Sequence, residues 1–360
     1  MRRGPVPIFR KALIAKAAAK SLNVAVRCRD ILTAAALVLA PLAQAGDHST
    51  NEFGFLGPTE LQDTFLPSQL RYQGYPESAS ILPKGTWSFN GTADWTAHLA
   101  KTDQYLFDGE SVTSTVKLRH TPLQDWEFGL DIPWTVRVDG ILDRFIEFVE
   151  TSLNAKVLAR YDLPRDLYQA FVTDGKNPTL LMTRAMGMND ITLRAKHQFF
   201  HQEQAGINAS IGMTLSLPSG DETFGGQGFS PGVGLHLERQ FTCDYTLLKG
   251  VNLMAGGTGN YYSDSREQLF LFNHWRGMGY AGAEIKFHRR LALVCMYQVY
   301  TAFASNYSPL TVAAHYYSFT GRFWIRPKTI LEMGVVENLG LIENRNSSDV
   351  TFKFAITHRF

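Results

Sequence analysis

Apolar and polar residues alternate strictly through the segment SSDVTFKFAITHRF, residues 347–360. Val350, Phe352 and Phe354 fall on one side of this alternation, and Lys353 and Arg359 fall on the other. Successive side chains of a β-strand point to opposite faces, so the pattern predicts a strand with one apolar and one polar face. Such a strand needs partners on both edges, because an open edge leaves a row of unpaired backbone groups.

The same alternation recurs along the chain and predicts an all-β fold. Twelve segments carry it: 86–99, 111–121, 126–138, 189–200, 207–217, 229–241, 250–262, 274–288, 291–303, 315–326, 329–339 and 349–360. Short connections follow the second, fourth, sixth, eighth and tenth segments, whereas most others are longer, above all residues 139–188. An antiparallel transmembrane β-barrel of about 12 strands, with both ends on one side, has this alternation of tight turns and longer loops.

The positions of the tryptophans favour a membrane barrel over a soluble β-sandwich, which alternation alone does not exclude. Trp87 and Trp95 lie eight residues apart on one face of a predicted strand, and Trp126 and Trp134 repeat that spacing. Eight residues of a tilted strand cover roughly 20 Å along the membrane normal, close to the distance between the two aromatic girdles of such barrels. We therefore expect outer-membrane lipid around the apolar face.

The last residue, Phe360, completes the final alternating strand. A terminal aromatic residue resembles the signature by which outer-membrane barrels are recognised by the barrel-assembly machinery. We therefore expect Phe360 to be an assembly signal, with that machinery as a partner during biogenesis.

The N-terminal region has the pattern of a cleavable secretory signal. Eight basic residues lie among the first thirty positions, which are followed by ILTAAALVLAPL and the small-residue site Ala43-Gln44-Ala45. This pattern predicts cleavage before Gly46. The apolar run is too short to span a bilayer, which takes about 20 residues. We expect a signal peptide (1–45), a periplasmic or plug-like segment (46–85) and a transmembrane barrel (86–360) in the outer membrane of a Gram-negative cell.

The charge balance and the cysteines bear on two further features, nucleic-acid binding and disulfide formation. The 35 basic residues are nearly balanced by 33 acidic ones, and no basic block lies beyond the leader, so a nucleic-acid partner is not expected. Cys243 and Cys295 remain after removal of the leader, and their predicted positions favour free thiols over a disulfide.

The polar faces of the predicted strands carry charges of both signs, which are expected to line the interior of the barrel. The candidate pore-lining residues are Lys117, Arg119, Glu127, Asp131, Arg194, Arg276, Glu284, Arg322, Glu332 and Lys353. The tight turns are expected to bring Arg119 near Glu127 and Arg322 near Glu332. This mixture of charges suggests a partly filled lumen, because a twelve-stranded barrel lies between the filled eight-stranded barrels and the open porins.

Residues 139–155 predict a short helix in the connection between the third and fourth strands. Ile141, Leu142, Phe145 and Ile146 recur at helical spacing. The apolar face of this helix needs a cover, so we expect it to constrict or cap the barrel, with a position at the membrane interface as the alternative.

Other motifs carry weaker signals. The segment LPSGDETFGGQGFSPG, residues 217–232, predicts a sharp glycine-rich loop, with cation binding through Asp221 and Glu222 as the alternative.

Four histidines fall on the polar face of the predicted strands, and none belongs to a motif of outer-membrane enzymes: His98, His236, His274 and His288. No cofactor or metal is expected, and a lipid-modifying or hydrolytic outer-membrane enzyme is the less favoured reading.

Four stretches resemble a family of predicted proteobacterial outer-membrane proteins that is defined only as a domain of unknown function. They are FGFLGPTELQDTFLPSQL, ESASILPKGTWSFNGTADW, FDGESVTSTVKLRHTPLQDWEFGLDIPW and DGILDRFIEFVETSLN, and the resemblance is strongest over residues 53–155. The resemblance implies an outer-membrane β-barrel and does not imply a substrate. Independently of the resemblance, about twelve strands leave more interior than side chains alone fill, and charged lumen residues are costly unless hydrated or paired. These points favour a narrow pore or transporter for small solutes, with a sealed barrel in a structural, assembly or surface-interaction role as the alternative.

Overall fold

A computed structural model describes the chain over residues 54–140, 142–152, 168–173, 178–180, 182–221, 223–226, 228–263, 272–305, 307–308, 310–338 and 347–360. Residues 51–359 form one compact unit. The leader expected at 1–45 therefore falls outside the described residues. No helix in the described ranges is both long enough and apolar enough to cross a membrane.

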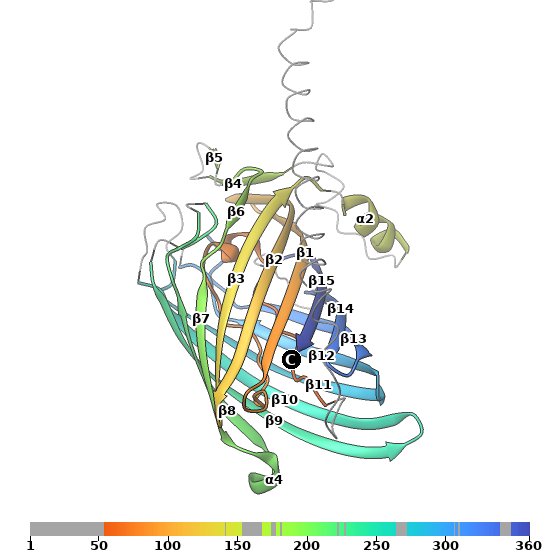
Figure 1. Ribbon diagram of the computed structural model, residues 1–360. Helices are drawn as coiled ribbons and strands as arrows, with labels where there is room; N and C mark the ends of the chain where they lie inside the picture. The colour runs from red at the N-terminus through yellow and green to blue at the C-terminus, as the bar shows by residue number, and fades with distance from the viewer. Residues whose placement is uncertain are drawn as a thin grey trace, which may run out of the picture. The chain divides into compact units, whose positions relative to one another are not determined.

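Twelve antiparallel strands close into a barrel, as the sequence predicts (Figure 1). Their bounds are β1 Trp87–Lys101, β2 Tyr105–Leu123, β3 Trp126–Val138, β7 Thr192–Phe200, β8 Asn208–Ser216, β9 Ser230–Tyr245, β10 Leu248–Tyr261, β11 Trp275–His288, β12 Leu291–Tyr300, β13 Ala314–Arg326, β14 Thr329–Glu337 and β15 Val350–Arg359. The barrel closes where β1 pairs with β15, with Trp95 opposite Phe352 and Asp94 opposite Lys353. The final alternating segment therefore supplies the partner that the first strand needs.

The connections confirm the expected alternation and define two ends of the barrel. At the turn end, β1 begins, β15 ends and connections such as 246–247, 289–290 and 327–328 are two residues long. The short helix α4, Gln202–Ala205, lies in the longer turn-end connection between β7 and β8. At the loop end, the connection from β3 to β7 contains α2 (Asp143–Ser152) and the short strands β4 (Gln169–Thr173), β5 (Pro178–Leu180) and β6 (Met186–Met188).

The strand β2 starts six residues earlier than the sequence predicts, at Tyr105 instead of residue 111. Its first residues pair with β4, with Tyr105 opposite Val172 and Asp108 opposite Gln169. The extra length is therefore stabilised by a strand from the long connection, which local alternation could not reveal.

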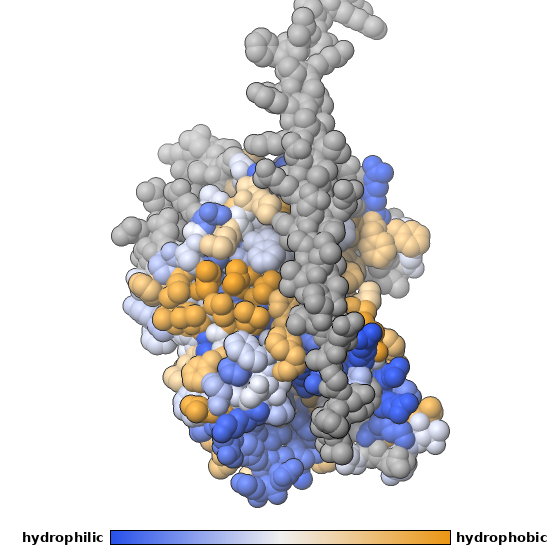
Figure 2. Space-filling view, viewed as in Figure 1, coloured by the Kyte–Doolittle hydropathy of each residue, from blue (hydrophilic) through white to orange (hydrophobic). Residues whose placement is uncertain are grey.

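The outer surface carries an apolar belt formed by outward side chains of many strands. Figure 2 shows these side chains gathered in a band across the visible face, with hydrophilic side chains below it. Exposed members include Phe128, Leu193, Ile211, Met213, Val233, Leu235, Leu253, Phe319, Phe323, Met333 and Phe354. An exposed apolar band of this kind is the expected lipid-facing surface of a transmembrane barrel.

Residues 54–86, hereafter the inner segment, run through the barrel interior before β1 (Figure 1). The segment includes the short helix η2, Leu66–Leu70. It contacts strands around the whole wall, from Asp131 on β3 to Glu284 on β11 and Thr351 on β15. The lumen is consequently occupied by the chain's own N-terminal region.

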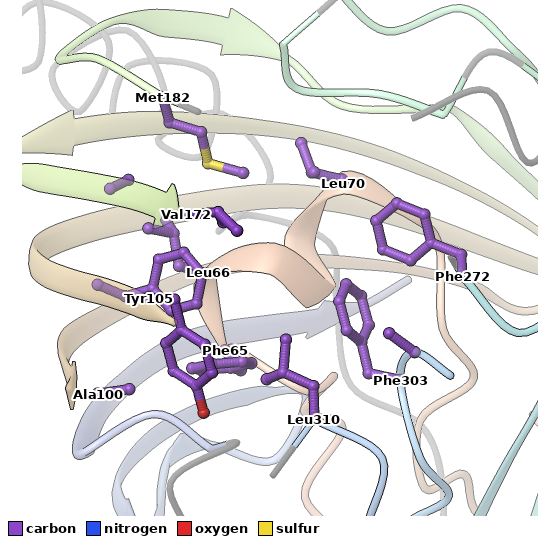
Figure 3. Close-up of a cluster of buried hydrophobic side chains, with 13 residues drawn as sticks. Phe65, Leu66, Leu70, Ala100, Tyr105, Val172, Met182, Phe272, Phe303 and Leu310 are labelled. Carbon is purple, nitrogen blue, oxygen red and sulfur yellow. The ribbon is translucent and has the colours of Figure 1, made fainter. Parts of the chain in front are cut away.

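The helix η2 forms the centre of an apolar cluster at the loop end of the lumen (Figure 3). Phe65, Leu66 and Leu70 are buried there against side chains from the wall and the loops. Their neighbours are Ala100, Tyr105, Phe107, Ala170, Val172, Met182, Phe272, Phe303, Ala304 and Leu310. Burial of these side chains fixes the inner segment in place, since each large apolar side chain removed from water contributes about 1.5–3 kcal/mol.

Candidate functional site: the filled lumen

All ten charged residues predicted to line the lumen lie on the inner side of the wall. Nine are buried, and Arg119 is half-buried. The structure brings them together in separate clusters, each of which reaches a residue of the inner segment.

The first cluster links β2, β3 and β7 to the inner segment. Asp131 accepts hydrogen bonds from Arg119 at 2.6 Å and from Tyr75 of the inner segment at 2.7 Å. Arg194 lies 3.2 Å from Asp131 and forms an ion pair with Glu77. Burial raises the pKa of Tyr75 well above its usual value, so its hydroxyl stays protonated and donates to Asp131.

The second cluster holds the start of the inner segment against β11, β13 and β14. Arg322 lies 3.1 Å from Glu284 and 3.3 Å from Glu332. Arg322 also donates to the carbonyl oxygens of Gly57 and Pro58, at 2.5 and 3.0 Å. Glu284 in turn accepts from the backbone N–H of Gly57 at 3.0 Å. Every charge in this cluster is therefore paired.

The third cluster joins Arg276 on β11 to the helical part of the inner segment. Arg276 lies 2.6 Å from Asp63 and donates to the Ser68 hydroxyl at 3.1 Å. Tyr316 on β13 donates to the other carboxylate oxygen of Asp63 at 2.5 Å. Two strands are thereby tied to one carboxylate of the inner segment.

The fourth cluster surrounds Glu60 of the inner segment. Lys117 lies 2.8 Å from the Glu60 carboxylate, and Lys353 donates to the Glu60 carbonyl at 2.9 Å while lying 3.3 Å from Asp94. Burial alone would raise the pKa of Glu60, but Lys117, Arg119 and Arg194 lower that pKa well below its usual value. Glu60 is therefore ionised at neutral pH.

One of the two expected contacts between neighbouring strands is present and the other is wrong. Arg322 and Glu332 are directly opposite across β13 and β14. Glu127, in contrast, is directly opposite Lys196 on β7 and pairs with it at 3.0 Å, whereas Arg119 pairs with Asp131. The expectation considered only the turn joining β2 and β3 and missed the neighbour on the other edge of β3.

The prediction that the 139–155 helix constricts the lumen is wrong for its described residues. Leu142 and Ile146 are buried against Trp95 and Phe352 on the outer face, and Phe145 makes an edge contact with Phe352. Figure 1 shows α2 beside the outside of the wall. Ile141 lies outside the described residues. The apolar face was predicted correctly, but outward aromatic residues cover it, and the inner segment fills the lumen instead.

The functional residues that the sequence did not reveal belong to the inner segment: Glu60, Asp63, Tyr75 and Glu77. Their wall partners lie far along the chain, with 213 positions between Asp63 and Arg276. The sequence signal for these residues is the excess of cations over carboxylates on the predicted inner face, because the surplus cations need carboxylates from another segment.

Two of the cavities lined by described residues lie between the inner segment and the wall. The loop-side cavity, about 60 Å³, is lined by apolar groups such as Leu70 and Phe224 and by polar ones such as Thr113, Thr115 and Asp190. The turn-side cavity, about 160 Å³, is lined by residues including Ser88, Asn90, Arg119, Glu127, Lys196, Thr357 and Arg359. Both cavities follow the side of the barrel formed by β1 and β2.

The glycine-rich loop folds back on the connection before β7. The Asp190 carboxylate accepts from the backbone N–H groups of Gly220 and Gly226, at 2.9 and 2.7 Å. Asp221 accepts from the backbone N–H of Met188 at 2.7 Å. These carboxylates are thus engaged with backbone donors, and the described residues contain no group of three metal ligands.

Two of the polar-face histidines contact hydroxyl groups inside the barrel. His98 Nε2 lies 2.9 Å from the Ser111 hydroxyl, and His236 Nδ1 lies 3.0 Å from the Tyr280 hydroxyl. His98 Nδ1 has no hydrogen-bond partner among the described residues. The Ser111–His98 pair therefore lacks a carboxylate that would orient the ring as in a hydrolase triad.

The model of the family DUF3187, described as a protein of unknown function, matches residues 49–360. The chain belongs to the DUF3187 family. The match includes the inner segment and the entire barrel, so both are parts of the DUF3187 sequence pattern. Comparison with curated proteins finds no relative of this sequence.

Solved structures similar to this DUF3187 protein are outer-membrane barrels. The COG4313 outer membrane channel from Pseudomonas putida F1 aligns with a TM-score of 0.52 at 12% identity, covering 80% of this chain and 100% of that one. The NanC porin aligns with a TM-score of 0.43 at 9% identity, covering 76% of this chain and 98% of that one. At such identities the first similarity establishes the fold of an outer-membrane barrel.

Proposed function

We propose that this DUF3187 protein is a narrow outer-membrane channel for small polar solutes, in which the inner segment restricts the lumen. The observation that carries this proposal is a pair of cavities between the inner segment and one side of the wall, each lined in part by charged and hydroxyl groups. They are neighbours along β2, because Thr113 and Thr115 line the loop-side cavity, Arg119 lines the turn-side one and Lys117 lines both.

The size and chemistry of these cavities limit what the path accepts. Cavities of about 60 and 160 Å³ are well below the roughly 300–1,000 Å³ of pockets that hold drug-sized ligands. Hydroxyl and charged groups favour hydrated polar solutes, which can exchange hydrogen bonds with the lining during passage. Large or apolar solutes are expected to be excluded.

A sealed barrel is the second candidate, and the buried packing of the inner segment favours it. The apolar cluster around Phe65 and Leu66 closes part of the loop end, and the ion pairs of Asp63, Glu77 and Glu60 hold the segment to the wall. A barrel filled in this way suits a structural, assembly or surface-interaction role without transport.

Planar-bilayer recordings of refolded protein distinguish the two candidates. We expect small, discrete conductance steps from the full chain and larger steps from a variant lacking residues 54–80. Heat-modifiable gel migration establishes that each sample is folded. Silence of both folded proteins would exclude a channel and leave the sealed barrel; silence of the full chain alone would show that the inner segment closes the lumen.

We further propose that the protein is exported by its leader, enters outer-membrane lipid through its apolar belt and is recognised by the barrel-assembly machinery through Phe360. The alternating β15 strand leading to that residue supports the last point. Replacement of Phe360 by Ser should lower the amount of heat-modifiable protein in the outer-membrane fraction. Unchanged amounts would argue against recognition of Phe360.

A further inference from the structure

The two cavities share only two lining residues, Glu60 and Lys117. Their side chains meet at 2.8 Å across the gap between the inner segment and β2. The Glu60 side chain retains 36% of its accessible surface although it lies within the barrel, which is consistent with its facing open space on both sides. The ion pair therefore lies where the two cavities meet.

The surroundings hold the lysine in place and leave the carboxylate as the movable partner. The Lys117 ammonium lies 4.1 Å from the ring centre of Tyr75, which is itself fixed by hydrogen bonds to Asp131 and Arg119. The Lys117 side chain is only 6% exposed. Glu60, in contrast, is anchored at its backbone carbonyl by Lys353, so its side chain can rotate without displacing the segment.

We propose that the Glu60–Lys117 ion pair is the gate and charge filter of the channel, joining the two cavities when it opens. This inference rests on the proposed channel function. Rotation of Glu60 away from Lys117 opens the contact between the cavities and exposes one charge of each sign to the passing solute. Because the open gate presents one charge of each sign close together, it passes small neutral polar solutes and discriminates weakly between ions.

The charge-filter part of the proposal predicts opposite selectivity in two single variants. Glu60→Gln leaves Lys117 and the neighbouring Lys353 without the carboxylate and should favour anions. Lys117→Gln leaves Glu60 with its carboxylate less compensated and should favour cations. Reversal potentials measured across a KCl gradient should consequently shift in opposite directions from that of the wild type.

The gate part predicts that the double variant Glu60→Gln/Lys117→Gln conducts at least about twice as well as the wild type, because an uncharged pair holds the cavities apart less strongly. The matched control is Glu127→Gln/Lys196→Gln. That pair has the same charges at 3.0 Å and lines only the turn-side cavity. The control should change conductance much less than the double variant does.

The outcomes separate this inference from the channel function itself. Equal conductance and reversal potential in wild type, both single variants and the control would overturn the gate while the channel stands. A silent wild type with a conducting Glu60→Gln/Lys117→Gln variant would support a closed gate. Conduction only after removal of residues 54–80 would overturn the gate. Silence of every folded variant, including that deletion, would overturn the channel and the gate together.

Discussion

Replacement of Arg322 by Met should destabilise the folded barrel strongly. Arg322 is 1% exposed and compensates two buried carboxylates, Glu284 and Glu332. Methionine fills a similar volume but leaves both carboxylates without their cation, and breaking a buried ion pair from one side typically costs 3–5 kcal/mol. The carbonyl oxygens of Gly57 and Pro58 also lose their donor, so we expect a loss of about 4 kcal/mol in the free energy of unfolding.

The assay is urea-induced unfolding in lipid vesicles, followed by tryptophan fluorescence and gel migration. The triple variant Arg322→Met/Glu284→Gln/Glu332→Gln should recover most of the loss, because neither carboxylate then remains buried without the Arg322 cation. Arg326→Met is the matched control, since Arg326 is exposed at the end of the same strand. The reasoning would be refuted if the free energy of unfolding of Arg322→Met lay within about 1 kcal/mol of that of the control. It would also be refuted if the triple variant were as unstable as Arg322→Met.

Three further predictions address the lipid face, pH and α2. Leu130 lies midway between the outward Trp126 and Trp134, so Leu130→Arg should lower the free energy of unfolding by about 2–4 kcal/mol in the same assay. The control Gln124→Arg, in the adjacent turn, should lower it little. Equal losses in the two variants would invalidate the inside–outside assignment. Glu60 has a lowered pKa in the folded protein, so the stability it contributes is complete above about pH 4.3 and declines as pH falls below that value. The stability difference between wild type and Glu60→Gln should therefore narrow in acid, and a constant difference would contradict the ion pair. Phe148 is 69% exposed on α2. If that helix lies on the membrane surface, brominated lipid should quench the fluorescence of the tryptophan in a Phe148→Trp variant. Absence of quenching would place the residue away from lipid.

The barrel could be predicted from the sequence because its signals are local. Alternation within a strand fixes which side chains face inward, and the lengths of the connections fix the order of strands. The predicted strand 126–138 matches β3 at both ends, and the inward placement of Arg322 and Glu332 follows from the pattern alone. Such information is contained in ten to fifteen consecutive residues, which is the length of one strand.

The course of the inner segment could not be predicted because its contacts are distant in sequence. Leu56 reaches Glu284 across 228 positions, and Thr64 reaches Thr351 across 287. The segment lacks a regular period, since it is held by separate side-chain contacts and not by a sheet. The position of α2 was missed for a related reason: helical spacing identifies an apolar face but does not say whether Phe352 or a lumen residue covers it.

The charges of the inner wall consequently divide into two groups. Some are paired by the neighbouring strand, as Glu127 is by Lys196. Others, namely Lys117, Arg194 and Arg276, have partners on the inner segment in Glu60, Glu77 and Asp63. All three wall members of this second group are cations, so removal of residues 54–80 would expose uncompensated positive charge along a wider lumen. A barrel lacking those residues should therefore have a higher conductance and a clear selectivity for anions, whereas the full chain should discriminate weakly between anions and cations. A widened channel with unchanged selectivity would show that these wall cations do not face the path.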